Sequence, residues 1–286
     1  MILIHKVEQS VRTKIKKIRL ADESIVEDFV ALEEPLEIQL SYLLKGQRVV
    51  RSITITMRTP GQDKDLALGF LLTEGIICNL GQVQDVIVPV DEKSGKPEEN
   101  RLRVILGDAV SVDVGKMDRN FYTTSSCGIC GKASLEALNM AGSNAFTGNR
   151  PKLLKEIIFI LPKELLQHQS TFLKTGGLHA AGLFNANGEL QTLREDVGRH
   201  NAVDKVAGSI LQDNTLCPQE SILLVSGRTS FEIVQKAVRA EIPFVLGVGP
   251  PSSLAVELSN TFNVTLLGFV SSERFNIYSS PERVLD

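Results

Sequence analysis

Cysteine is scarce in this chain. Four cysteines in 286 residues are too few for the disulfide framework that stabilises small secreted domains. Residues 1–17 carry scattered basic side chains but neither the apolar core nor the small-residue cleavage pattern of a signal peptide. These absences predict a cytoplasmic protein whose thiols remain reduced.

Long apolar runs and a strong net charge are missing as well. No run approaches the ~20 residues that a membrane-spanning helix requires. The formal net charge of -3 disfavours a surface that coats nucleic acid. With 43% hydrophobic and 23% charged residues, the composition is that of a globular protein with one large domain or two smaller ones. We therefore expect no membrane and no nucleic-acid partner.

Two of the four cysteines, Cys127 and Cys130, lie three positions apart. Gly128, Gly131 and the preceding serines predict an exposed loop in which both thiols are accessible. Such a pair can be half of a zinc site, a dithiol/disulfide switch, or a nucleophile with a resolving partner. No second Cys-x-x-Cys and no His-x-x-x-His accompanies it, so we expect no structural metal. The redox pair is disfavoured by its position midway through a large chain, but it stays open beside the nucleophile or sulfur-carrying thiol.

The first part of the chain has the pattern of a β-sheet with one helix. We expect an N-terminal arm or edge strand over residues 1–20, a domain over 21–120, and a second domain over 121–286. Alternating or β-branched residues predict strands at 25–30, 36–44, 47–57 and 83–90, and a hairpin that pairs 102–106 with 110–114. Apolar residues at helical spacing near 66–71, behind an acidic first turn, predict the helix.

The second part alternates buried strands with helices. Apolar runs at 221–225, 244–248 and 264–269 are separated by helical patterns at 231–240 and 254–260. A further hairpin turns at Asn187 and Gly188, and a helix follows at 201–211. This alternation is typical of parallel strands covered by helices on both faces, so the expected class is α/β.

Polar turns follow each of the three apolar runs. Ser226, Gly227 and Arg228 follow the first, a Gly-Pro-Pro-Ser-Ser turn the second, and Ser271 to Arg274 the third. Ligands bind at the carboxyl ends of parallel strands, so these turns suit a nucleotide or another phosphorylated ligand. In any single turn, Ser and Gly are explained by a helix cap, but three such turns in succession favour a ligand. Neither a Walker A sequence nor a Gly-x-Gly-x-x-Gly fingerprint occurs.

The densest polar segment covers residues 194–201, with Asp204 and Lys205 one turn further on. Within it, His200 can act as an acid or base and Arg199 can pair with an anion. A solvated, capped helix start explains the segment equally well. His179 lies among small residues, where a histidine of the core or behind a site is the leading expectation.

Several motifs, taken in order, resemble the FdhD/NarQ family, the accessory sulfurtransferases of formate dehydrogenases. They are Thr-Pro-Gly-Gln-Asp at 59–63, Leu-Gly-Phe-Leu-Leu-Thr-Glu-Gly-Ile-Ile at 68–77, Ser-Ser-Cys-Gly-Ile-Cys-Gly-Lys at 125–132, Thr-Gly-Gly-Leu-His-Ala-Ala at 175–181, the segment 194–205 and Ser-Gly-Arg-Thr-Ser at 226–230. The resemblance extends from about residue 20 to the C-terminus.

The resemblance implies a fold and a function. The fold would be a C-terminal cytidine deaminase-like three-layer domain with a mixed sheet, preceded by a smaller, sheet-rich α/β-roll domain. Cys127 would accept persulfide sulfur from a cysteine desulfurase, with Cys130 as its partner. The sulfur would pass to the molybdenum or tungsten of bis-molybdopterin guanine dinucleotide, as formate dehydrogenase requires, and the protein would be a homodimer.

The resemblance also locates the cofactor-binding residues near the third strand end. They would be Phe269, Val270, Ser271, Ser272, Glu273 and Arg274, and the phosphates would account for the polar groups of Ser226, Gly227, Arg228 and His200. The alternative is a cofactor-binding chaperone, or a thiol-disulfide protein, that transfers no sulfur. Deaminase chemistry is disfavoured because Ala180 and Ala181 follow His179, where zinc deaminases have a catalytic glutamate.

Overall fold

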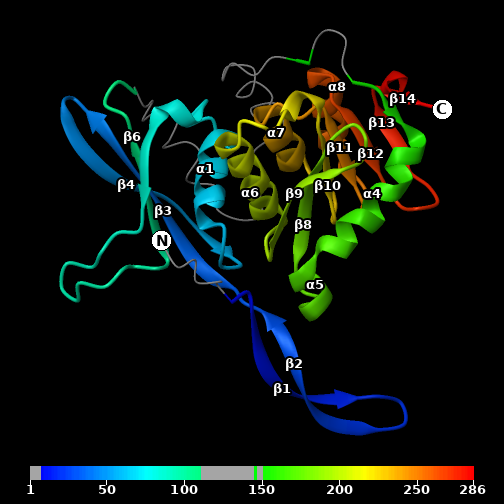
Figure 1. Ribbon diagram of the computed structural model, residues 1–286, viewed down its shortest axis with the longest axis horizontal. Helices are drawn as coiled ribbons and strands as arrows, with labels where there is room; N and C mark the ends of the chain where they lie inside the picture. Colours follow the sequence, from blue (N-terminus) through cyan, green and yellow to red (C-terminus); the bar gives the residue numbers. More distant parts are fainter. Residues whose placement is uncertain (1–7, 111–144, 147–150) are drawn as a thin grey trace.

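The protein is a mixed α/β molecule (Figure 1), and the structure, a computed structural model, describes residues 8–110, 145–146 and 151–286. The strands in the first part of the chain are β1 (Ser10–Ile18), β2 (Glu23–Ala31), β3 (Glu34–Leu44), β4 (Gln47–Arg58), β5 (Val83–Ile87) and β6 (Arg101–Leu106). Those in the second part are β7 (Leu153–Leu154), β8 (His179–Phe184), β9 (Leu190–Asp196), β10 (Ile222–Val225), β11 (Phe244–Gly247), β12 (Thr265–Gly268), β13 (Asn276–Ser279) and β14 (Val284–Leu285). The α-helices are α1 (Asp63–Thr73), α4 (Lys155–His168), α5 (Ser170–Thr175), α6 (Arg199–Gln212), α7 (Phe231–Arg239) and α8 (Ser253–Phe262).

Strands β1 and β2 form a two-stranded hairpin of their own that projects from the rest of the molecule (Figure 1). Its base is attached to α5, where the Lys174 amino group lies 4.0 Å from the centre of the Phe29 ring and donates a hydrogen bond to Ser10. The sequence suggests an N-terminal arm that ends at residue 20. In the structure this residue lies within the hairpin, between β1 and β2.

The next four strands form one sheet in the order β4-β3-β6-β5. The predicted strands at 36–44 and 47–57 are confirmed as β3 and β4, and the chain turns between them at Lys45 and Gly46, which have φ values of 51° and 80°. The predicted pairing of 102–106 with 110–114 is wrong. Strand β6 pairs with β3 on one side and β5 on the other, so it has no free edge for a hairpin partner. The turn residues end the strand as expected, but burial in the middle of the sheet decides its neighbours; residues 111–114 lie outside the described part.

The larger sheet has the order β13-β12-β11-β10-β8-β9. Strands β10, β11 and β12 are parallel, while β8, β9 and β13 run antiparallel to their neighbours. Successive residues of β10 face opposite sides: Leu223 and Val225 pack with α6, α7 and α8, whereas Ile222 and Leu224 pack with α4. The predicted strand-helix alternation is confirmed, and helices cover both faces of the sheet.

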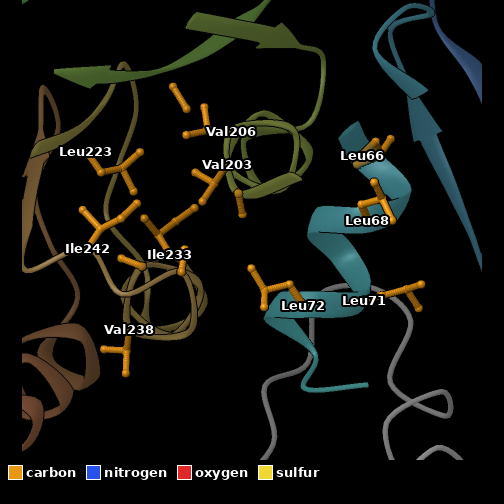
Figure 2. Packing of buried hydrophobic residues seen from close by; sticks show 14 of the residues in the cluster. Leu66, Leu68, Leu71, Leu72, Val203, Val206, Leu223, Ile233, Val238 and Ile242 are labelled. Carbon is orange, nitrogen blue, oxygen red and sulfur yellow. The ribbon is translucent and has the colours of Figure 1, made fainter. Parts of the chain in front are cut away.

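The two sheets share one continuous core because α1 packs directly against α6. Figure 2 shows Leu72 on the side of α1 that faces α6 and α7, and Leu71 on its opposite side. The buried side chains of all three helices belong to one cluster. The helices cross at two glycines. A Cβ atom on Gly69 would lie 1.7 Å from the carbonyl oxygen of Asp204, and one on Gly208 would lie 1.8 Å from that of Asp65. Backbone touches backbone at this crossing, which only glycine permits.

No helix within the described ranges is both long and apolar enough to cross a membrane.

The crossing predicts a large effect of a single methyl group. Gly69→Ala would push α1 away from α6, and since the clash is with rigid backbone we expect a loss of more than about 3 kcal/mol of unfolding free energy. Gly107→Ala, where the nearest atoms would be 3.9 Å away, is the matched control and should change stability little. Urea unfolding followed by circular dichroism measures both. Equal stability of the two variants would contradict the close crossing.

Candidate functional site

The loops after β10, β11 and β12 lie side by side at the carboxyl edge of the sheet. The Gly249 N–H donates to the Gly227 carbonyl at 3.0 Å, and the Phe269 N–H donates to the Gly249 carbonyl at 3.2 Å. These bonds join the three loops in series across the edge. The predicted convergence of the three polar turns is therefore confirmed, at the place where open parallel sheets bind ligands.

Two histidines reach the same edge from other elements. Strand β8 runs antiparallel to β10, which brings His179 beside Gly227; the His179 Nδ1 atom lies 3.4 Å from the position that a Cβ of Gly227 would take. Helix α6 begins at Arg199, and the Nε2 atom of His200 lies 3.3 Å from Ser230 Oγ, just before α7. Both histidines are half-buried rather than part of the core.

The serines at this edge have three different roles. Ser252 is a helix cap, because its hydroxyl accepts a bond from the Ala255 N–H at 3.2 Å. Ser226 accepts a bond from the Ala180 N–H at 2.9 Å and ties the loop to β8. Ser230 precedes α7, yet its side chain makes no capping bond. The cap explanation thus accounts for Ser252 but not for Ser230.

The segment after β12 is a tight turn with an exposed end. Phe269 has a φ of 55°, a left-handed conformation that costs a non-glycine residue on the order of 1 kcal/mol. Val270 is buried, and Ser271 accepts bonds from the N–H groups of Glu273 and Arg274. Ser272, Glu273 and Arg274 are exposed, as is Arg228 in the first loop. The edge therefore presents two guanidinium groups to solvent.

Much of the polar segment 194–205 joins the two parts of the chain. Asp196 and Lys205 form an ion pair at 2.8 Å, and both side chains are 0% exposed. The Asp196 carboxylate also accepts bonds from the Thr59 N–H and from the side chain of Asn201, and Lys205 donates to the Thr59 carbonyl. These residues connect the end of β4 to α6, so their role is structural.

A second buried ionic cluster lies between α1, α6 and α7. Lys236 donates to both carboxylate oxygens of Asp204 at 2.9 Å, and the Thr73 hydroxyl donates to Asp204 at 2.7 Å. Burial alone would lower the pKa of Lys236, but the carboxylates of Asp204 and Glu74 outweigh burial and raise that pKa. Lys236 is therefore a permanent cation behind the site.

Arg199 and His200 are the members of the segment that face the edge. Burial and the positive charges of Arg199 and Lys236 lower the pKa of His200 from 6.5 to about 4. Burial and Arg199 lower the pKa of His179 as well. Both imidazoles are thus held in the neutral form, which accepts and donates hydrogen bonds but adds no charge. The buried Nε of Arg199 has no hydrogen-bond partner among the described residues.

The predicted thiol pair, Cys127 and Cys130, lies outside the described residues. The two described cysteines are exposed, so neither packs in the core. Cys217 lies just before the short helix that leads into the start of β10, at the amino edge of the sheet. Cys78 interacts with Arg239 at the C-terminal end of α7, also remote from the loops after the strands. In the described ranges, no three metal-binding side chains are grouped to hold a metal ion.

The sequence does not reveal two residues that the structure brings to this region. Glu232 lies 3.9 Å from His200, and Lys236 lies behind it. An acidic residue in the first turn of a helix and a basic one in the last turn are ordinary helix features, so neither gave a signal. Only the packing of α7 against α6 shows what they contact.

The structural role of Asp196 predicts a strong effect on stability. Asp196→Ala leaves the Lys205 ammonium buried without its partner, which should cost about 3–5 kcal/mol of unfolding free energy. The double variant Asp196→Ala/Lys205→Met, which removes both charges, should recover part of that loss. Urea unfolding at neutral pH measures both, and a double variant no more stable than the single one would contradict the pairing.

The depressed pKa of His200 predicts a pH effect with a defined sign. The unfolded chain takes up a proton on this histidine near 6.5, whereas the folded chain does so only near 4. Stability is therefore lost as the pH falls through that window. The unfolding free energy is compared at about pH 7 and about pH 5, which lie above and below the ordinary histidine pKa of 6.5. The change between these two values should be smaller in His200→Gln than in the wild type. An unchanged difference would contradict the shift.

Comparison with known proteins places the chain in a family. A profile of the FdhD/NarQ family matches residues 31–285. A protein of Sulfurisphaera tokodaii named "Sulfur carrier protein FdhD" is 42% identical over 96% of this chain and 98% of the relative. One of the same name from Streptomyces coelicolor is 42% identical over 96% of this chain and 95% of the relative.

A solved structure agrees with these sequence relatives. It is described as that of a formate dehydrogenase accessory protein from Desulfotalea psychrophila, and it covers 97% of this chain and 100% of its own. The TM-score is 0.72 at 28% identity. With a family profile that spans most of its length and relatives that match from end to end, the chain belongs to the FdhD/NarQ family.

Proposed function

We propose that this protein is a sulfur carrier, a sulfurtransferase that supplies sulfur to the bis-molybdopterin guanine dinucleotide cofactor of formate dehydrogenase. The observation that carries the proposal is its near full-length similarity to relatives named "Sulfur carrier protein FdhD". The chain has one Cys-x-x-Cys pair to carry sulfur, Cys127 and Cys130. The other two cysteines lie away from the carboxyl edge of the sheet.

The proposed acceptance step is a sulfur exchange between thiols. The Cys127 thiolate attacks the terminal sulfur of a persulfide on a cysteine desulfurase. A new S–S bond forms on Cys127, and the bond in the donor breaks to release its cysteine as a thiolate. No net oxidation occurs, and the persulfide is now carried by Cys127.

The proposed delivery step uses Cys130 as the resolving thiol. Its thiolate attacks the Cys127 sulfur, a Cys127–Cys130 disulfide forms, and the terminal sulfur leaves as sulfide for the molybdenum or tungsten of the client. The two electrons come from the dithiol, which a cellular dithiol reductant then restores. Both cysteines serve in one cycle.

The carboxyl edge of the larger sheet is the proposed cofactor site. Arg228 and Arg274 are exposed there and suit the phosphates of a guanine dinucleotide, since guanidinium groups bind phosphate oxygens in pairs. The layered sheet agrees with the proposed cytidine deaminase-like description of the second domain. In this proposal, the part of the fold that holds the substrate in deaminases binds the molybdopterin guanine dinucleotide instead.

The proposed partners follow from the reaction. A cysteine desulfurase donates the sulfur and formate dehydrogenase receives the finished cofactor, with the carrier acting as a homodimer in the cytoplasm. The relative of known structure is described as an accessory protein of formate dehydrogenase.

Replacement of the carrier cysteine tests the proposal. Incubation of the wild type with a desulfurase and free cysteine should add the mass of one sulfur atom to Cys127, located by peptide mass spectrometry. Cys127→Ala should acquire no sulfur and should fail to restore formate dehydrogenase activity in cells that lack the wild-type carrier. Cys217→Ala is the matched control and should behave like the wild type.

The same variant separates sulfur transfer from a chaperone role. If Cys127→Ala binds guanine nucleotide as tightly as the wild type and also restores formate dehydrogenase activity, the protein is a cofactor-binding chaperone and the sulfur-carrier proposal is wrong.

A further inference from the structure

Aliphatic side chains are concentrated at the free end of the β1–β2 hairpin. The tip, defined as residues 18–25, contains Ile18, Leu20 and Ile25, which are 72%, 111% and 77% exposed. Within the described ranges no other large hydrophobic side chain is as exposed as these three. The tip lies at the end of the hairpin that is farthest from the rest of the molecule (Figure 1). A cluster of this kind marks an interaction site, whereas single exposed aliphatic residues do not.

The backbone holds the tip in a defined shape. The Arg19 N–H donates a hydrogen bond to the Asp22 carbonyl at 2.8 Å, which closes a tight turn around Leu20. The register of the two strands places Ile18 and Ile25 on the same face of the hairpin as diagonal neighbours. The three aliphatic side chains are therefore presented together, without any contact to the core.

The charge of the hairpin differs from that of the whole protein. Residues 10–19 contain five basic residues and no acidic one. The half of the hairpin that includes the tip, residues 14–25, has four basic and two acidic residues and thus a net charge of +2, whereas the whole chain has -3. The aliphatic cluster therefore lies in a locally basic region of an acidic protein, which favours an anionic partner surface.

The two carboxylates near the tip are compensated within the hairpin. Glu23 forms an ion pair with Lys16 at 2.8 Å, and Asp22 forms one with Arg19 at 3.5 Å. In the part of the chain that the structure describes, Lys14 and Lys17 form no ion pair with a carboxylate. These two lysines are exposed and supply the net positive charge of this half of the hairpin.

The size of the tip distinguishes between a protein and a lipid partner. A stable protein interface covers roughly 800 Å² on each partner and involves about 20–30 residues of each. The tip consists of residues 18–25 at the end of a two-stranded arm, too few for such an interface. A lipid surface requires only a few aliphatic side chains that enter the acyl boundary, together with basic groups at the level of the phosphates.

We propose that the tip of the β1–β2 hairpin inserts into the surface of an anionic lipid bilayer. Its three aliphatic side chains enter the boundary between headgroups and acyl chains, and Lys14 and Lys17 contact the lipid phosphates. The lack of long apolar runs excludes a membrane-spanning helix, but this contact is peripheral and needs none. The inference goes beyond the proposed function, because it involves neither the carboxyl edge of the larger sheet nor the thiol pair.

Co-sedimentation of the full-length protein with vesicles tests the contact. The wild type should bind vesicles of equimolar phosphatidylglycerol and phosphatidylcholine at least about tenfold more tightly than vesicles of phosphatidylcholine alone. Leu20→Ser should lower the partition coefficient roughly tenfold, and Lys14→Gln/Lys17→Gln roughly twentyfold. Ile55→Ser, at a 62% exposed position of β4, and Lys163→Gln, at an exposed position of α4, are the matched controls and should bind like the wild type.

Insertion is observed directly with a tryptophan at the tip. The chain contains no tryptophan, so Leu20→Trp introduces a single fluorophore. Anionic vesicles should shift its emission to shorter wavelength, and lipids brominated on their acyl chains should quench it. Ile55→Trp is the matched control and should show neither effect.

Four results would overturn the inference. They are a wild type that does not bind anionic vesicles, equal binding to vesicles of phosphatidylcholine alone, a Leu20→Ser variant that binds as tightly as the wild type, and a Leu20→Trp emission that shifts with protein concentration in the absence of lipid. The last result would show that a second copy of the chain covers the tip. Sulfur loading of Cys127 is measured without lipid, so the carrier function and the lipid contact can each fail alone.

Discussion

The buried ion pair between Asp196 and Lys205 is the interaction on which the rest of the structure depends. Both charges are withdrawn from water, and each is compensated by further hydrogen bonds to the end of β4 and the start of α6. A buried pair of this kind contributes little net stability when compared with apolar packing, but its directional bonds specify one arrangement of the surrounding backbone. Here they specify how the first sheet meets the second.

Helix α6 has two tasks because of this arrangement. Its middle crosses α1 at Gly69 and Gly208, so that the two parts of the chain share one core. Its first turn, with Arg199 and His200, lies at the edge where the loops after three parallel strands converge. The same helix therefore joins the two parts of the chain and supplies groups to the candidate site, and a shift of its first turn would move both.

Neutral histidines and charged arginines occupy different parts of this edge. Burial and the positive charge of Arg199 lower the pKa of both histidines, and Lys236 adds to this effect at His200, while Arg228 and Arg274 face the solvent. A ligand with anionic and uncharged polar parts meets a different surface with each part. In the proposed function, the charged part would meet the phosphates of a nucleotide and the neutral part its uncharged groups.

The sequence by itself determined the order of the elements, the α/β class, the convergence of three polar turns and the family. Hydrophobic periodicity and parallel-strand geometry are local rules, and motifs in a fixed order identify a family without any knowledge of contacts. It did not determine the neighbours of β6 or the separate roles of Ser226, Ser230 and Ser252. It also gave equal weight to a structural and a functional role for the segment 194–205. Only the tertiary structure decided these points, because Asp196, Lys205 and Glu232 find their partners through the packing of elements distant in sequence, which no local pattern records.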